Sequence, residues 1–163
     1  MRAFDYEEPR TVEEAVSLLA KPGRNRLLAG GTDLLVRIKR REWTVDRVIN
    51  LKRIEALRGI EERGDQVWVG PLTTLDELEA SESIAKRWPF LRETIHEMGS
   101  PQVRAMATVG GNLCNASPAA DIAPPLLCLD AVMTATGPKG ARAISLREFF
   151  AGPGKTVLAP DEI

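Results

Sequence analysis

The chain has 163 residues, of which 44% are hydrophobic and 28% charged, so it can bury a core and falls within the usual size of one domain. Its 22 basic residues are scattered among 23 acidic ones and leave a formal charge of -1, which excludes the basic field needed to bind a nucleic-acid backbone. The sequence has neither a signal-peptide-like N-terminus nor any run near the roughly 18 apolar residues of a membrane span, so we expect a cytoplasmic protein without membrane attachment.

The first predicted element is a short amphipathic helix over residues 11–20. Thr11 and Glu14 stand at the spacing of a capping box, in which a hydroxyl and a carboxylate bind free N–H groups at the start of a helix. Apolar residues follow at helical intervals until Pro22-Gly23, a pair that ends a helix.

A predicted strand-to-helix turn comes next. The segment RLLAG, residues 26–30, has the apolar run of a buried strand, and DLLVRIKRR, residues 33–41, has the pattern of a helix. Thr32 and Asp33 are both residue types that cap helix N-termini. The pair Gly30-Gly31 therefore lies on the turn between the two elements.

After Trp43 the pattern changes to short strands. The segments RVINL (47–51), LRGIEER (57–63) and QVWVG (66–70) are partly β-branched and are separated by turn residues such as those at 63–65. Such segments predict a small sheet of antiparallel strands or hairpins.

Two more helices are predicted in the middle of the chain. TTLDELEAS, residues 73–81, repeats the capping-box spacing with Thr74 and Glu77, and WPFLRETIHEMGS, residues 88–100, is a helical pattern that ends near Gly99. Because helices and strands mix without a regular β-α-β period, the order favours an α+β fold over a doubly wound parallel sheet.

The last third of the chain contains a second glycine pair, Gly110-Gly111. We expect a polar loop from Asn112 to Ser117 and then a helix from Ala119 to Leu129. The segments 132–136 and 141–144 flank Gly-Pro-Lys-Gly and predict a hairpin.

The two glycine pairs are candidates for binding an anion. Glycine lets backbone N–H groups come within hydrogen-bonding distance of a ligand, so the loops AGGTD and TVGGN could hold a diphosphate from two sides, with further hydrogen bonds from Thr32, Thr108 and Asn112. Neither loop matches the G-x-G-x-x-G or the phosphate-loop motif, which excludes those two explanations. A Gly-Gly sequence is also an ordinary tight turn, and this alternative stays open.

The cysteines give no metal site. Cys114 and Cys128 form no C-x-x-C pair, and His96, the single histidine, cannot complete a zinc site with them at any usual spacing. We expect both to be buried thiols that ligate nothing.

The remaining candidates have two interpretations each. Asp121 can cap a helix or accept a hydrogen bond from a sugar-like hydroxyl, and its position alone favours capping. Five aromatic residues can stack on a flat cofactor ring such as a flavin or nicotinamide, but core packing is favoured for each. They are Trp43, Trp68, Trp88, Phe149 and Phe150.

Three segments taken in order carry a family resemblance: LLAGGTDLLVRIK, TVGGNLCNASPAADIAPPLLCLDA and REFFAGPGKTVLAPDEI. They resemble the FAD-binding (medium) subunit of molybdenum hydroxylases, the group of xanthine dehydrogenase and carbon monoxide dehydrogenase. The resemblance covers nearly the whole chain from FDYEEPR onward. It implies that residues 1–163 form an α+β FAD-binding domain of the vanillyl-alcohol oxidase (PCMH) type, with two small lobes that meet near residues 50–55.

The resemblance also implies the residues that bind FAD. They hold its diphosphate between the two glycine loops, and Asp121 approaches the ribityl region, which replaces the capping role favoured above. The implied residues are Leu27, Leu28, Ala29, Gly30, Gly31, Thr32, Asp33, Leu34, Thr108, Val109, Gly110, Gly111, Asn112 and Asp121. No side chain is expected to act as a catalytic acid or base.

The function implied by the resemblance is electron transfer. Members of the family pass electrons from a molybdenum-pterin site through two [2Fe-2S] clusters to FAD, and then to NAD or another acceptor. With two cysteines, this chain cannot hold those clusters. The resemblance therefore implies two partners, a large subunit with the molybdenum cofactor and a small [2Fe-2S] subunit.

The sequence departs from the family pattern at its end, because the family chain continues into a further C-terminal domain beyond PDEI. We therefore expect exposed apolar surface and self-association through the terminal segment. The apolar residues in question are Phe149, Phe150, Val157, Leu158 and Ile163. The alternative function is a non-catalytic binding or assembly module that keeps the fold and uses its loops for FAD, for another phosphate ligand, or for none.

Overall fold

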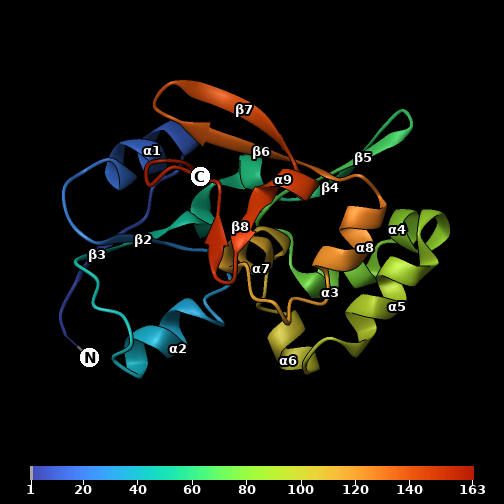
Figure 1. Ribbon diagram of the computed structural model, residues 1–163, viewed down its shortest axis with the longest axis horizontal. Helices are drawn as coiled ribbons and strands as arrows, with labels where there is room; N and C mark the ends of the chain where they lie inside the picture. Colours follow the sequence, from blue (N-terminus) through green and yellow to red (C-terminus); the bar gives the residue numbers. More distant parts are fainter. Residues whose placement is uncertain (1) are drawn as a thin grey trace.

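The computed structural model describes residues 2–163, and it confirms the predicted α+β class. Figure 1 shows a small sheet with two helices at one end of the molecule, a group of short helices at the other, and the long β6–β7 hairpin along the top. The first part consists of β1 (Asp5–Glu7), α1 (Val12–Leu19), β2 (Asn25–Leu28), α2 (Leu34–Lys39) and β3 (Arg47–Asn50). The predicted division into two lobes stays a prediction.

The first sheet is parallel, which corrects the expectation of antiparallel pairing for residues 47–51. Its strand order is β1-β3-β2, and β3 pairs in parallel with both neighbours. The chain reaches β2 and β3 through helices α1 and α2, and a crossover of this kind returns each strand in the same direction. β1 has only 3 residues, none of them buried, so its sequence carries no strand signal.

The rest of the chain contains the two predicted hairpins and a series of short helices. β4 and β5 form the antiparallel hairpin expected from residues 57–70, and β6 and β7 form the second. The elements are η1 (Leu51–Arg53), η2 (Glu55–Leu57), β4 (Ile60–Arg63), β5 (Gln66–Val69), α3 (Leu75–Ala80), α4 (Glu82–Arg87), α5 (Pro89–Glu97), α6 (Pro101–Arg104), α7 (Val109–Asn115), α8 (Ala123–Cys128), β6 (Val132–Gly137), β7 (Gly140–Ser145), α9 (Leu146–Phe149), β8 (Phe150–Gly152) and β9 (Lys155–Thr156).

One of the two predicted capping boxes is complete. At α3 the Thr74 hydroxyl accepts from the Glu77 N–H at 3.1 Å, and the Glu77 carboxylate accepts from the Thr74 N–H at 2.7 Å. At α1 the Thr11 hydroxyl accepts from the Glu14 N–H, but the Glu14 carboxylate accepts from the N–H of Arg10. Both helices begin where the sequence predicts.

The segment after the second glycine pair is helical, so the predicted polar loop from Asn112 is wrong. α7 begins after Thr108, whose hydroxyl accepts from the Gly111 N–H at 3.1 Å, and it ends before Ala116, which has a left-handed φ of 48°. A good N-cap outweighs the glycine-rich composition of the first turn. The following helix, expected from Ala119, begins only at Ala123.

The main core lies between the helical group and the two later hairpins. Its fully buried side chains include Leu75, Leu78, Ile95, Leu113 and Phe149. A second cluster under α1 joins the first sheet to the segment after it, and the partly buried Ile163 packs against this cluster.

The terminal segment covers most of its own apolar side chains, against the expectation of an exposed apolar end. Phe149 is fully buried, Phe150 and Leu158 are partly buried, and only Val157 is exposed, at 39%. The backbone groups of Ile163 and Thr136 exchange two hydrogen bonds of 2.8 Å. These contacts weaken the argument for self-association through residues 149–163. None of the helices described over residues 2–163 is long and apolar enough to cross a membrane.

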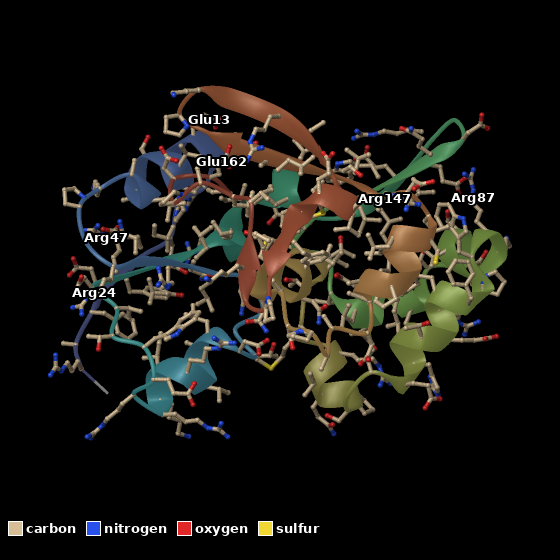
Figure 2. The ribbon with its side chains drawn as sticks, in the orientation of Figure 1. Glu13, Arg24, Arg47, Arg87, Arg147 and Glu162 are labelled. Carbon is tan, nitrogen blue, oxygen red and sulfur yellow. The ribbon has the colours of Figure 1, made fainter. Side chains whose placement is uncertain are left out.

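Glu162 fixes this segment on the β6–β7 hairpin, on the side where the hairpin passes over α1 (Figure 2). Its carboxylate accepts from Arg142 Nε at 2.7 Å and from the Ala159 N–H at 2.8 Å. The Arg142 guanidinium, and next the Ala159 N–H, lower the pKa of Glu162 from 4.5 to about 2.

This lowered pKa predicts a pH dependence of stability. A carboxyl whose pKa is depressed by folding stabilises the fold above its unfolded pKa, and this contribution disappears as the pH falls towards the folded value. We expect the free energy of unfolding of the wild type to exceed that of Glu162→Gln at pH 7, and the difference to shrink between pH 4.5 and about 2. Denaturant titrations of both proteins at several pH values measure it. A difference that does not change with pH would contradict the assignment.

Candidate functional site

A cleft of about 750 Å³ opens between the first sheet, α7 and the β6–β7 hairpin, and both glycine pairs line it. A volume of this size is typical of sites for large cofactors. The predicted site residues in its lining are Leu27, Ala29, Gly30, Gly31, Asp33, Leu34, Gly110 and Gly111. Those outside its lining are Leu28, Thr32, Thr108, Val109, Asn112 and Asp121.

The loop between β2 and α2, which lines this cleft, has free hydrogen-bond donors. Within residues 2–163, the backbone N–H groups of positions 30–34 donate to no other atom of the chain. Gly31 has a φ of +90°, a conformation that a side chain would strain. Consecutive unpaired N–H groups at a concave surface form an anion-binding site, so this loop has the donors that a diphosphate needs.

Packing alone is enough to require a glycine at position 30. A Cβ placed on it would lie 2.1 Å from the carbonyl oxygen of Met106. Backbone therefore packs directly on backbone here, and the segment that leads into α7 holds the first glycine loop in place. The packing explains why this position is a glycine, and a role of Gly30 in binding FAD stays a prediction.

The second glycine pair is packed and has its donors already bonded. Gly110 N–H donates to the Pro71 carbonyl at 2.9 Å, and Gly111 N–H donates to the Thr108 hydroxyl at 3.1 Å. A Cβ on Gly110 would lie 2.6 Å from Cβ of Pro71. This pair forms part of the wall of the cleft. The Gly111 N–H can bind an anion only if the anion replaces the Thr108 hydroxyl as its acceptor.

Two predicted residues have unused polar atoms outside the cleft lining. The Oδ1 atom of Asn112 is buried without a hydrogen-bond partner in the described chain. Asp121 is exposed, and it does not cap α8, whose N-cap is Ile122. The capping interpretation of Asp121 is therefore wrong, and its role towards the ribityl chain stays a prediction.

The expectation of buried thiols is wrong for both cysteines, which have exposed surface. Cys114 lies on α7 one turn after the glycines and lines the cleft. The Cys114 side chain keeps some exposed surface, but the protein atoms packed around its thiol desolvate it in part, which raises the pKa of Cys114 to about 11. Among residues 2–163 there is no cluster of three side chains able to hold a metal ion.

The sequence reasoning missed two stacks of arginine on tryptophan in the cleft lining. Arg26 and Arg37 lie over Trp43, with Cζ 5.0 and 4.6 Å from the ring centroid, and Arg63 lies over Trp68 at 5.0 Å. Core packing was expected for both tryptophans, but they are half-buried at the cleft. Arg26 comes from a separate strand, so no local pattern could reveal its stack on Trp43, whereas Arg63 and Trp68 are diagonal neighbours in the β4–β5 hairpin.

Comparison with known proteins decides the family. Residues 2–163 match the family described as FAD binding domain in molybdopterin dehydrogenase. The chain belongs to this family. The fold is therefore that of an FAD-binding domain.

The relatives are subunits of dehydrogenases. The chain is 38% identical over 162 residues to the carbon monoxide dehydrogenase medium chain of Afipia carboxidovorans, covering 99% of this chain and 56% of the relative. It is 34% identical over 159 residues to the xanthine dehydrogenase FAD-binding subunit of Escherichia coli O157:H7, covering 97% and 54%. The chain thus spans about half the length of these relatives.

A solved structure has the same fold. The structure of reconstituted CO dehydrogenase from Oligotropha carboxidovorans superimposes with a TM-score of 0.96 at 38% sequence identity, over 99% of this chain and 57% of that one. The observed donors fit FAD, because the free N–H groups of residues 30–34 suit a diphosphate and the adjoining cleft has mostly apolar walls for the rings.

Proposed function

We propose that this domain is the FAD-binding part of a medium subunit of a molybdenum hydroxylase, and that the subunit relays electrons from iron-sulfur clusters of a partner to NAD or another acceptor. The observation that carries the proposal is the first glycine loop, whose N–H groups at residues 30–34 are free and which lines a large cleft with Gly30, Gly31, Asp33 and Leu34. Nothing else in the described chain offers so many unpaired donors in one place.

The residues of the cleft bind and orient the cofactor in this proposal. The N–H groups of residues 30–34 donate to the oxygens of the diphosphate, while Leu27 and Leu34 exclude water beside it. Thr108 holds the first turn of α7 against the opposite side. Bound FAD supplies the redox chemistry, since its ring can take up and release either one or two electrons.

The partners are part of the proposal. The relatives are named as medium chains and FAD-binding subunits of dehydrogenases, which supports a complex with a molybdenum-cofactor large subunit and a [2Fe-2S] small subunit. A cytoplasmic location remains a prediction. The visible absorption spectrum of the purified chain tests the core of the proposal: flavin bands that persist after gel filtration support it, and a colourless chain that takes up no added FAD favours a module without a redox role.

Cys114 provides a position-specific test of where FAD binds. Because its thiol lines the cleft and Cys128 does not, bound FAD should block modification of Cys114 alone. With FAD at ten times its dissociation constant, we expect modification of Cys114 to slow by roughly tenfold while Cys128 reacts as before. The rates are measured by mass spectrometry at about pH 9, since the raised pKa leaves little thiolate at neutral pH.

The two cysteines control for each other in this experiment. Equal slowing at both would indicate a general tightening of the fold. Unchanged rates at both, in a chain that binds FAD, would place the cofactor away from α7 and contradict the proposed site.

A further inference from the structure

A cluster of two arginines and a tryptophan, which we call the Trp43 stack, lies beside the first glycine loop. It consists of Arg26 on β2, Arg37 on α2 and Trp43 after α2, with both guanidinium carbons within 5.0 Å of the indole centroid. Arg26 and Trp43 line the cleft. Guanidinium groups from a strand and a helix thus stack on the same indole ring.

The charge of this stack is not neutralised by the protein. Within residues 2–163, neither Arg26 nor Arg37 has a carboxylate oxygen within 4.0 Å. Arg26 donates to the Asn25 carbonyl at 2.9 Å, and Arg37 donates to Asn115 Oδ1 at 3.1 Å. Both guanidinium groups therefore keep their charge and several N–H donors for another anion.

The second stack in the cleft differs in this respect. Arg63 lies over Trp68 in the β4–β5 hairpin, but its guanidinium pairs with the Glu61 carboxylate at 2.6 Å. The cleft thus has one cationic stack and one neutralised stack. A ligand with phosphates near one of its aromatic rings would be attracted to the first of them.

The Trp43 stack also lies close to the loop that has the free N–H groups. α2 begins at Leu34, directly after the loop, and Arg37 follows one helical turn later, a rise of about 5 Å. Across the cleft, Asn115 follows Gly111 by about one turn of α7, and Arg37 donates to it. A phosphate bound at residues 30–34 would therefore lie a short distance from the stack.

We propose that the Trp43 stack binds the adenylate half of FAD and thereby selects FAD over FMN, an inference that rests on the proposed function. The adenylate half is the shorter arm on the diphosphate, and its flat purine can stack on guanidinium and indole planes. The two arginine charges also favour the adjacent phosphate. The longer riboflavin arm then extends away from the Trp43 stack.

Binding of three nucleotides by the purified chain tests this assignment. ADP has the adenylate arm without a flavin, FMN has the flavin without the adenylate arm, and FAD has both. For Trp43→Leu and for Arg26→Met we expect the affinities for ADP and FAD to fall by about tenfold, with the affinity for FMN unchanged. Isothermal titration calorimetry gives the three dissociation constants for each protein.

The Arg63–Trp68 stack supplies matched controls. Arg63→Met and Trp68→Leu remove the same groups from the same cleft, and they should leave ADP affinity at the wild-type value. Thermal unfolding of each variant verifies that it folds, and Arg26→Met, which changes an exposed side chain, keeps the test valid where Trp43→Leu is unstable.

The outcomes are distinct. Loss of ADP binding in the Trp68 variants but not in the Trp43 variants would show the opposite orientation and overturn the inference. Wild-type affinities in all variants would overturn it as well, while leaving FAD binding in place. Equal affinity of the wild-type chain for FMN and FAD would contradict the proposed selectivity. A wild-type chain that binds no FAD would contradict both the proposed function and this inference.

Discussion

Gly30→Ala is expected to destabilise the fold by about 3 kcal/mol, because the new Cβ would overlap a backbone atom that cannot rotate away. The ideal Cβ position lies 2.1 Å from the Met106 carbonyl oxygen and 3.0 Å from Cα of Ala107. Relief requires moving the first glycine loop away from the segment that leads into α7. Thermal unfolding should show a melting temperature lower by roughly 10 °C for a chain of this length, together with weaker FAD binding.

Gly140→Ala provides a contrast with this change, because Gly30 has no positive φ and Gly140 has no close neighbour. A Cβ on Gly140 meets nothing within 4 Å, but the residue has a φ of +105°, so the variant measures the cost of backbone strain alone. A Gly30→Ala chain with wild-type stability and lost FAD binding would contradict the packing explanation. It would show instead that the ligand needs the space above Gly30.

Arg104→Met is expected to cost about 3 kcal/mol of unfolding free energy, because it breaks a buried ion pair and leaves acceptors without donors. The Arg104 side chain is 9% exposed and its Nε lies 3.0 Å from Oε2 of Glu79. It also donates to the carbonyl groups of His96 at 3.0 Å and Met98 at 3.1 Å. Chemical denaturation of both proteins measures the difference.

Arg147→Met is the matched control, since it removes a guanidinium from an exposed pair. Arg147 lies 2.7 Å from Asp130, and the two side chains are 65% and 73% exposed; Figure 2 shows Arg147 at the surface near α9. We expect this variant to remain within about 0.5 kcal/mol of the wild type. Equal losses of unfolding free energy in Arg104→Met and Arg147→Met would mean that the burial of the Arg104 ion pair and hydrogen bonds adds nothing to stability.

Local signals in the sequence located several elements correctly. The capping box of Thr74 and Glu77 starts α3 where predicted, and the Gly30-Gly31 pair lies on the strand-to-helix turn. These features depend on residues within a few positions of one another. The same signals placed both glycine pairs in one candidate site, and the fold brings them to one cleft.

Features that depend on distant contacts escaped the sequence analysis. The parallel pairing of β3 is decided by where α1 and α2 pack, and the strand sequence alone does not report it. The two glycine pairs also pack on residues that are distant in the sequence. Gly110 packs on Pro71, and Gly30 packs on Met106. The stack at Trp43 needs Arg26 from a separate strand, so its residues show no recognisable spacing.

The contact of Gly30 with the Met106 carbonyl has a thermodynamic consequence for the cofactor. Because this packing and the conformation of Gly31 set the shape of the loop, the loop with the free N–H groups of residues 30–34 already has its folded shape before any ligand arrives. Binding then immobilises few backbone dihedral angles, and the conformational entropy that a flexible loop would lose has already been lost on folding. Affinity for the cofactor is in this way coupled to the stability of the protein. A change that loosens the contact at Gly30 makes the loop more flexible before binding, so that binding then costs more conformational entropy.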